Sequence, residues 1–268
     1  MNIVLIGYGK MGKMLREEAV KGGHIITAVV DPRITGTEPP ADIWVYKTIE
    51  EVKNLEQADV AFEFTRPDTA ADNLKALAKR KIPVVTGTTG WYDRLDEVKA
   101  AVEAAGSSLL WASNFSLGVN LFYRIAWYAA KLADPFPEYD VAGYEVHHNK
   151  KADSPSGTAK TLVEGVLERV KRKQKPVWDT LNRPPAPEEL HYPSLRLGST
   201  PGIHTLIFDS PADTIEISHT ARGREGFAAG AVLAAQWLVS RGSFSAPGTP
   251  PKRGVFTMDD VLTEILGM

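Results

Sequence analysis

Cysteine is absent from this chain of 268 residues. Its absence excludes disulfide bonds, thiolate nucleophiles and thiolate metal ligands. It is also compatible with a reducing compartment, and we expect a cytoplasmic protein. The chain has no large excess of charge of either sign, since its formal net charge is −2. Non-specific nucleic-acid binding needs a basic surface, so we expect no nucleic-acid partner.

Long hydrophobic runs are missing as well. The longest apolar stretch near the C-terminus, Ala231–Val239, is interrupted by Gln236, and it is much shorter than the ~20 residues of a membrane-spanning helix. The N-terminus begins directly with a strand-like run, so we expect no signal peptide and no membrane partner. Hydrophobic residues nevertheless make up 43% of the chain, which is ordinary for a globular protein with a substantial core.

Strand and helix patterns alternate along the first half of the chain. The expected strands are short β-branched runs at Asn2–Ile6, Ile25–Val30, Val60–Phe64, Ile82–Val85 and Leu109–Trp111. The expected helices lie between them at Met11–Val20, Thr48–Leu55, Thr69–Lys79 and Leu95–Ala104. This alternation predicts a parallel sheet with helices on both faces.

The pattern changes after Asn114. We expect helices at Val119–Leu132, Thr158–Lys171 and Phe227–Val239, a strand at Val141–His147 and a loop over Gln174–Pro193. Ser210–Asp213 is typical turn chemistry and predicts a hairpin between strands His204–Asp209 and Thr214–His219. Thr257 and Asp260 resemble the capping box of a last short helix. The section between the first half and these final helices therefore predicts a smaller α+β domain with a mixed or antiparallel sheet.

The first strand is followed by Gly7-Tyr8-Gly9-Lys10-Met11-Gly12, which has the spacing G-x-G-x-x-G. In a dinucleotide-binding loop the first glycine makes the turn, the second admits the pyrophosphate and the third lets the helix pack on the strand. The helix that follows presents free N–H groups to the phosphates. A glycine-rich turn that binds nothing is the alternative, but the strand, the helix and the second strand all fall where the motif needs them.

Asp31 ends that second strand, and Arg33 follows two residues later. A carboxylate at this position accepts hydrogen bonds from the adenosine ribose and repels a 2′-phosphate, whereas an arginine attracts that phosphate. We therefore expect NADH and/or NADPH as cofactor, with NADH used at least as well as NADPH. The fold class is α/β: a Rossmann-type domain over residues 1–116 and 226–268, and a second domain over residues 117–225.

The segment Glu145–Ala159 concentrates histidines, lysines and a Ser-Gly-Thr turn at a predicted helix start. A metal site built from His147, His148 and Asp153 is disfavoured, because adjacent strand residues point to opposite faces. A solvated loop capped by Ser156 or Thr158 is the plain alternative. The third interpretation is an anion site: the start of the helix with Ser156, Gly157 and Thr158 holds a carboxylate, while His147 and Lys151 perform acid–base chemistry.

This segment resembles the E-x-H-H-x-x-K-x-D-x-P-S-G-T-A signature of the 4-hydroxy-tetrahydrodipicolinate reductase (dihydrodipicolinate reductase) family. Further stretches are similar to that family's other motifs and occur in the expected order, over nearly the whole chain: Phe64–Pro67, Gly87–Gly90, Asn114–Asn120, Arg196–Phe208 and His219–Ala228. One departure is that Asn149 and Lys150 stand where members often have Arg and His.

The resemblance implies a function and a set of site residues. The implied reaction is NAD(P)H-dependent reduction of 4-hydroxy-tetrahydrodipicolinate, a small dicarboxylate of lysine biosynthesis, by a homotetramer built through the second domain. His147 and Lys151 are the implied catalytic pair, with substrate bound by His148, Gly157 and Thr158 and with Ser156 beside them. Two further stretches are implied to contact the cofactor: Gly87, Thr88 and Thr89, and Ala112, Ser113, Asn114 and Phe115. No metal is expected. A dehydrogenase for another substrate and a non-catalytic dinucleotide sensor stay open as alternatives.

Overall fold

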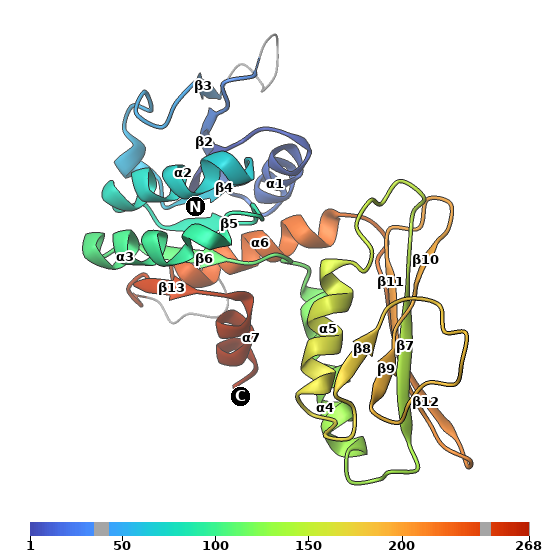
Figure 1. The fold of residues 1–268 in the computed structure, drawn as a ribbon. Coiled ribbons are helices and arrows are strands. Elements are labelled where there is room, and N and C mark those ends of the chain that lie inside the picture. Colours follow the sequence, from blue (N-terminus) through green and yellow to red (C-terminus); the bar gives the residue numbers. More distant parts are fainter. Residues whose placement is uncertain (35–42, 242–247, 268) are drawn as a thin grey trace. The chain divides into compact units, whose positions relative to one another are not determined.

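The computed structural model describes residues 1–34, 43–241 and 248–267 (Figure 1). The chain divides into two compact units, Met1–Ser116 with Glu225–Met268, and Leu117–Arg224. The boundaries expected from the sequence differ from these by one residue. No helix within the described ranges is long and apolar enough to cross a membrane.

The first unit is built on a sheet of seven strands in the order β13-β6-β5-β4-β1-β2-β3, and every pairing in it is parallel. Its strands are β1 (Asn2–Ile6), β2 (Ile25–Val30), β3 (Trp44–Tyr46), β4 (Val60–Glu63), β5 (Val84–Thr86), β6 (Ser108–Trp111) and β13 (Gly254–Phe256). The order in which successive strands are added to the sheet reverses between β1 and β4. Open α/β sheets bind their ligands at such a point.

Helices cover both faces of this sheet, and the alternation of side chains along the strands explains why. In β1, Ile3 and Leu5 pack into one apolar cluster, while Val4 and Ile6 pack into another. The first cluster is completed by α1 (Lys10–Lys21), α6 (Glu225–Leu238) and α7 (Met258–Leu266). The second is completed by α2 (Pro67–Lys79) and α3 (Leu95–Ala105). Such strands are apolar on both faces, as parallel sheets require.

The second unit is a mixed sheet of four strands in the order β10-β7-β11-β12, with helices α4 and α5 packed on one face (Figure 1). The elements are α4 (Leu117–Ala133), β7 (Asp140–His147), α5 (Gly157–Leu167), β10 (Ser194–Arg196), β11 (Ile203–Asp209) and β12 (Thr214–Thr220). The β10–β7 pairing is parallel, whereas the β7–β11 and β11–β12 pairings are antiparallel. The predicted hairpin is therefore present, and the expected fold class is confirmed.

Two of the expected elements are wrong. The segment expected as a helix over Thr48–Leu55 forms turns that lead into a short 3-10 helix, η1 (Leu55–Gln57). Asn54 adopts a left-handed conformation with φ of 55°, which is incompatible with a continuing α-helix. The expected loop over Gln174–Pro193 contains β8 (Lys175–Val177) and β9 (Glu189–His191), which pair with each other in parallel.

The capping box at the last helix is confirmed, because the backbone N–H of Thr257 donates to Oδ2 of Asp260 at 2.7 Å.

Candidate active site

The glycine loop lies between β1 and α1 in the first unit. Gly7 has φ of +92°, and a Cβ there would lie 2.2 Å from the carbonyl oxygen of Phe64. A Cβ on Gly12 would lie 2.3 Å from the carbonyl oxygen of Gly7. Neither position accepts a side chain, so both glycines are required by the fold itself.

Gly9 differs from these two glycines. It is the N-cap residue of α1 and makes no side-chain cap, and a Cβ built on it meets nothing within 4 Å. Lys10 and Met11 follow as the first residues of the helix. The start of α1 is thus an open backbone surface at the carboxyl edge of the sheet, and it fits the phosphates of a dinucleotide.

Asp31 is buried just beyond β2. Its Oδ2 accepts from the backbone N–H of Tyr8 at 2.9 Å, and its Oδ1 accepts from the backbone N–H of Arg33 at 2.9 Å. Burial raises the pKa of Asp31, but these hydrogen bonds and the Arg33 guanidinium outweigh it, so that the pKa lies below its usual range. Asp31 is therefore an ionised carboxylate that joins the glycine loop to the loop carrying Arg33.

The two other expected cofactor loops follow neighbouring strands of the same edge. Thr88, after β5, accepts at Oγ1 from the backbone N–H of Thr65 at 2.8 Å, and its carbonyl accepts from Nε1 of Trp91 at 2.7 Å. Thr89 is exposed beside it. After β6, the backbone N–H of Ala112 donates to the carbonyl of Thr86 at 3.2 Å.

The end of the β6 loop is fixed by Asn114, whose Oδ1 accepts from the backbone N–H of Ser116 at 2.9 Å. Ser113 is exposed, and Phe115 is buried with its ring 6.0 Å from that of Phe64. A buried carboxylate, Glu63, lies behind the β5 loop and accepts from Oγ1 of Thr86 at 2.6 Å. The sequence reasoning missed Glu63 because its one-residue signal, an acid at the end of an apolar strand, is not distinctive.

In the second unit, the strand register assembles a row of polar side chains on the face that carries α4 and α5. Glu145 on β7 is paired with Ser194 on β10 and with His204 on β11. His204 is paired in turn with His219 on β12. Paired residues point to the same side of a sheet, and His147, two residues after Glu145, points to that side too. Side chains far apart in the sequence thereby meet at one place.

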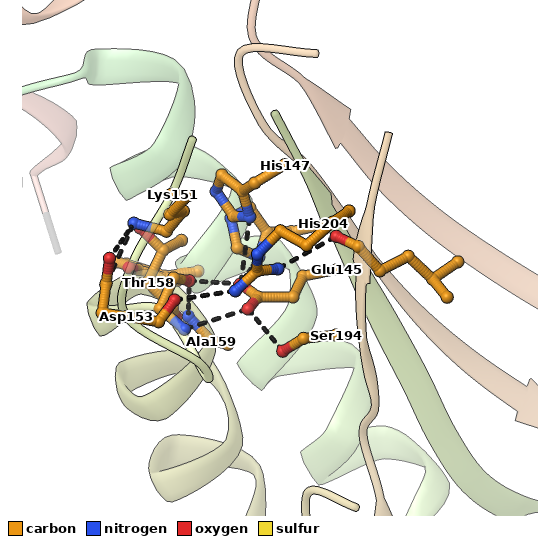
Figure 2. Close-up of polar contacts among 12 residues, drawn as sticks. Glu145, His147, Lys151, Asp153, Thr158, Ala159, Ser194 and His204 are labelled. Atoms are coloured by element: carbon orange, nitrogen blue, oxygen red, sulfur yellow. Dashed lines mark hydrogen bonds and ion pairs between the residues drawn. The ribbon is translucent and has the colours of Figure 1, made fainter. Parts of the chain in front are cut away.

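Glu145 is the centre of this row and has no exposed surface. Its Oε1 accepts from the backbone N–H of Ser156 at 2.9 Å and from Oγ of Ser194 at 2.6 Å. Its Oε2 accepts from Oγ of Ser156, and it lies 3.5 Å from Nδ1 of His147 and 3.8 Å from Nδ1 of His204. Figure 2 shows the two imidazoles beside this carboxylate.

The ionisation of the row follows from its burial. Burial raises the pKa of Glu145, but hydrogen bonds from Ser156 and Ser194 outweigh it, and the pKa is below its usual value. Burial lowers the pKa of His147 more than the Glu145 charge raises it. Burial also lowers the pKa of His204, to about 4. Near neutral pH the row therefore holds an ionised carboxylate and mainly neutral imidazoles.

Lys151 reaches this region through a turn rather than through strand alternation. β7 ends at His147, and the backbone N–H of Lys151 donates to the carbonyl of His148 at 3.1 Å. The ammonium group pairs with both carboxylate oxygens of Asp153, at 2.8 and 3.0 Å. His148 is partly buried at the strand end, and its Nδ1 has no hydrogen-bond partner among the described residues.

The start of α5 completes the site. Ser156 is the N-cap residue, and its Oγ accepts from the backbone N–H of Ala159 at 3.1 Å. Gly157 is exposed with open space around it, and Thr158 is partly exposed. The first N–H groups of a helix have no acceptor within the helix, so Gly157 presents a backbone donor at this end of α5. Figure 2 shows Thr158 in the same region as His147 and Lys151. The Ser156 cap, which we also expected for a simple solvated loop, is present. It lies next to titratable side chains, however.

One group of side chains within the described ranges has the spacing of metal ligands. It consists of Glu145, His147 and His204, whose ligand atoms lie within 4.8 Å of one another. The sequence analysis considered His147 with His148 and Asp153 instead, and it assigned no catalytic or binding role to Glu145, Ser194 or His204. The Glu145 carboxylate already accepts three hydrogen bonds, which leaves it about one acceptor position.

Comparison with known proteins extends the sequence resemblance. Residues 1–115 match the family model for the dihydrodipicolinate reductase N-terminus, and residues 118–262 match the model for its C-terminus. A 4-hydroxy-tetrahydrodipicolinate reductase of Christiangramia forsetii is 35% identical, and the alignment covers 99% of each chain. The enzyme of the same name from Archaeoglobus fulgidus is also 35% identical, with 95% of this chain and 96% of that one covered.

A solved structure agrees in fold. It is described as dipicolinate-bound dihydrodipicolinate reductase from Paenisporosarcina sp. TG-14, and it aligns with a TM-score of 0.75 at 21% identity over 96% of this chain and 97% of that one. The family models together span nearly all of the sequence, and the relatives match over nearly their full length. The chain belongs to the dihydrodipicolinate reductase family.

Proposed function

We propose that this chain reduces 4-hydroxy-tetrahydrodipicolinate to tetrahydrodipicolinate, with loss of water, in the diaminopimelate route of lysine biosynthesis. The observation that carries the proposal is the grouping of His147, Lys151 and the start of α5 on one face of the second unit. This grouping places an anion site beside acid–base groups, in a chain that also has a dinucleotide loop. Full-length similarity to reductases of this name supports the same reaction.

The dinucleotide is held by the first unit in this proposal. Gly7, Gly9 and Gly12 shape the loop, and the first N–H groups of α1 bind the pyrophosphate. The loops at Gly87–Thr89 and Ala112–Phe115 follow strands of the same sheet edge and contact the nicotinamide end. When bound, the nicotinamide supplies the hydride.

The substrate carboxylate is bound by backbone N–H groups of Gly157 and Thr158, and the ammonium group of Lys151 adds positive charge nearby. His148, at the end of β7, offers a further polar contact. Two carboxylates on a small ring need such paired donors, and fixed donors hold the ring in one orientation for hydride transfer.

Proton delivery falls to Lys151. Hydride addition to the conjugated ring leaves negative charge that a proton must neutralise. The pKa of His147 is lowered by burial, so its imidazole is mostly neutral near pH 7, whereas the Lys151 ammonium forms an ion pair with Asp153. We assign His147 the role of a neutral hydrogen-bonding and acid–base partner next to the reacting ring.

The sheet face of the second unit that carries no helix supports a homotetramer, which the family resemblance implies. This face has apolar side chains on neighbouring strands, among them Tyr144, Leu195 and Ile207. Replacing Ile207 with lysine is expected to lower the mass measured by light scattering. An unchanged tetramer, or a wild type that is monomeric, would exclude this face as the interface. We also propose that the protein is cytoplasmic.

A coupled assay tests the reaction. The substrate is generated enzymatically in the cuvette, and oxidation of NADH and of NADPH is followed separately. Substrate-dependent oxidation is expected with at least one of them. Oxidation only with an amino-acid semialdehyde or another carbonyl substrate would favour a different dehydrogenase. Tight dinucleotide binding without any turnover would favour a sensor.

A further inference from the structure

The Glu145 carboxylate contacts both the start of α5 and the His147 imidazole. Through Ser156 it holds the start of α5, because it accepts from the backbone N–H at 2.9 Å and from the hydroxyl of that N-cap residue. Its Oε2 also faces Nδ1 of His147 at 3.5 Å.

The acceptor positions of Glu145 are almost filled. A carboxylate has about four acceptor positions. Oε1 accepts from the Ser156 N–H and the Ser194 hydroxyl, and Oε2 accepts from the Ser156 hydroxyl. The remaining position on Oε2 lies next to two imidazole Nδ1 atoms, and neither of them has a hydrogen-bond partner in the part of the chain that the structure describes. His147 is the nearer of the two.

We propose, on the basis of the function proposed above, that Glu145 is the positioning residue of the site: one carboxylate holds His147 as its Nδ1–H tautomer and fixes the N-cap of the carboxylate-binding helix. The Nδ1–H form leaves the Nε2 lone pair available as an acceptor on the other side of the ring. Glu145 itself does not touch the substrate and acts through His147 and Ser156.

Two neighbours support this orientation of the ring. The His204 imidazole packs edge-on against His147, with centroids 5.1 Å apart and an interplanar angle of 70°. A Cβ at Gly202 would lie 3.1 Å from Nε2 of His147. Because residue 202 is a glycine, space remains next to Nε2, the nitrogen that faces the substrate when Nδ1 carries the proton.

Charged and titratable groups from every neighbouring element act on His147. These groups are Glu145 on β7, Lys151 and Asp153 in the segment after it, Arg196 on β10 and His204 on β11; His219 on β12 acts through His204. Glu145 has the largest effect among the charges acting on His147, and it raises the pKa of His147, whereas Lys151 and Arg196 lower it. Removing the Glu145 charge must therefore lower the pKa of His147 further.

Histidine-selective 15N NMR provides the test. The chain has six histidines, and the signals of His147 are assigned by their loss in His147→Gln. In the wild type, nitrogen shifts are expected to identify the Nδ1–H tautomer. In Glu145→Gln, which keeps the side-chain shape but removes the charge, the pKa of His147 should fall by about 1 to 3 units.

Ser194→Ala is the matched control, because it removes one hydrogen bond to Glu145 but keeps the charge. Its effect on the His147 pKa should be less than about half a unit, clearly smaller than that of Glu145→Gln. In steady-state kinetics, Glu145→Gln should raise KM and lower kcat, since it loosens the helix start and the imidazole together.

Three results would overturn the proposal. These are an Nε2–H tautomer in the wild type, an unchanged His147 pKa in a folded Glu145→Gln, or equal pKa changes in both variants. The wild-type tautomer is measured without Glu145→Gln, so the proposal is tested even where that variant does not fold. The NMR results need no substrate either. A wild type without reductase activity would therefore refute the proposed function separately from the role of Glu145.

Discussion

The backbone N–H and the guanidinium Nε of Arg33 both lie against Oδ1 of Asp31, at 2.9 Å and 3.4 Å. Asp31 is thus an acceptor for its own loop, with its other oxygen occupied by the Tyr8 N–H. The Arg33 side chain is 65% exposed, so most of its charge is available to a ligand. The acid that favours NADH and the base that favours NADPH are therefore paired with each other.

Replacing Arg33 with alanine should shift cofactor use towards NADH. The loss of the cation removes attraction for a 2′-phosphate but takes nothing from the ribose hydroxyls. We expect kcat/KM with NADPH to fall about tenfold, which corresponds to about 1.4 kcal/mol, and the value with NADH to change much less. The assay compares both cofactors at saturating substrate.

Arg33→Lys is the control for this change, because it keeps the charge without the planar fork, and it should fall between the wild type and Arg33→Ala. Equal losses with both cofactors would argue that Arg33 only holds its loop. In the wild type, a kcat/KM that strongly favours NADPH would contradict our expectation that NADH is used at least as well.

Gly7 and Gly9 form a natural pair of test positions in the dinucleotide loop. Gly7 has a φ of +92°, and a Cβ there would clash with the Phe64 carbonyl, whereas a Cβ at Gly9 would meet nothing within 4 Å. Gly7→Ala should therefore lower the free energy of unfolding by about 2 kcal/mol or more. Gly9→Ala should change it by less than about 0.5 kcal/mol yet weaken NADH binding about tenfold or more.

Chemical denaturation of the free protein and calorimetric titration with NADH measure the two effects. If Gly9→Ala bound NADH as the wild type does, the phosphates could not lie against the backbone at this position. If Gly7→Ala were fully stable, the close approach of β1 and β4 at the loop would be relaxed in solution.

Local patterns were enough to predict the elements whose signals are continuous in the sequence. The glycine loop with its flanking strands, β7 and the hairpin of β11 and β12 are examples, because each is specified by neighbouring residues. The segment Thr48–Leu55 failed since helical spacing was outweighed by the left-handed turn at Asn54. β8 and β9 were missed because three-residue strands have no measurable periodicity.

The centre of the candidate site was hidden for a different reason. Glu145 meets His204 and Ser194 only through the register of β7 with β11 and β10. The register between strands that are far apart in the sequence depends on the tertiary fold, and neither segment specifies it alone. The motif around Glu145 could be recognised from the sequence, but the role of its first residue could not.

Lys151 and Lys150 are adjacent lysines with different environments. Lys151 is partly buried and paired with Asp153, whereas Lys150 is exposed. If Lys151 delivers the proton, Lys151→Ala should lower kcat by ~10²- to 10⁴-fold and leave NADH binding intact. Lys150→Ala should lower kcat far less. Similar losses in the two variants would indicate that general positive charge, rather than a proton donor at one position, is needed.

His204 makes the folded protein sensitive to acid. Burial lowers its pKa from the ordinary 6.5 to about 4, so protonation favours the unfolded chain, where the imidazole is in water. The stabilisation is complete above the unfolded pKa and is lost as the pH falls from about 6.5 to about 4. The pKa difference corresponds to a loss on the order of 3 kcal/mol. Thermal melts of the wild type at steps through this window should show it as a falling Tm.

A variant separates this effect from the protonation of carboxylates. His204→Gln has no titrating group at position 204, so its Tm should fall less steeply between pH 6.5 and pH 4, although its Tm at pH 7 is lower because a buried site is altered. His191→Gln, on the partly exposed β9 position, is the matched control and should keep the wild-type slope. Parallel slopes for wild type and His204→Gln would mean that His204 is protonated without cost, and hence that the buried row opens to water in acid before the protein unfolds.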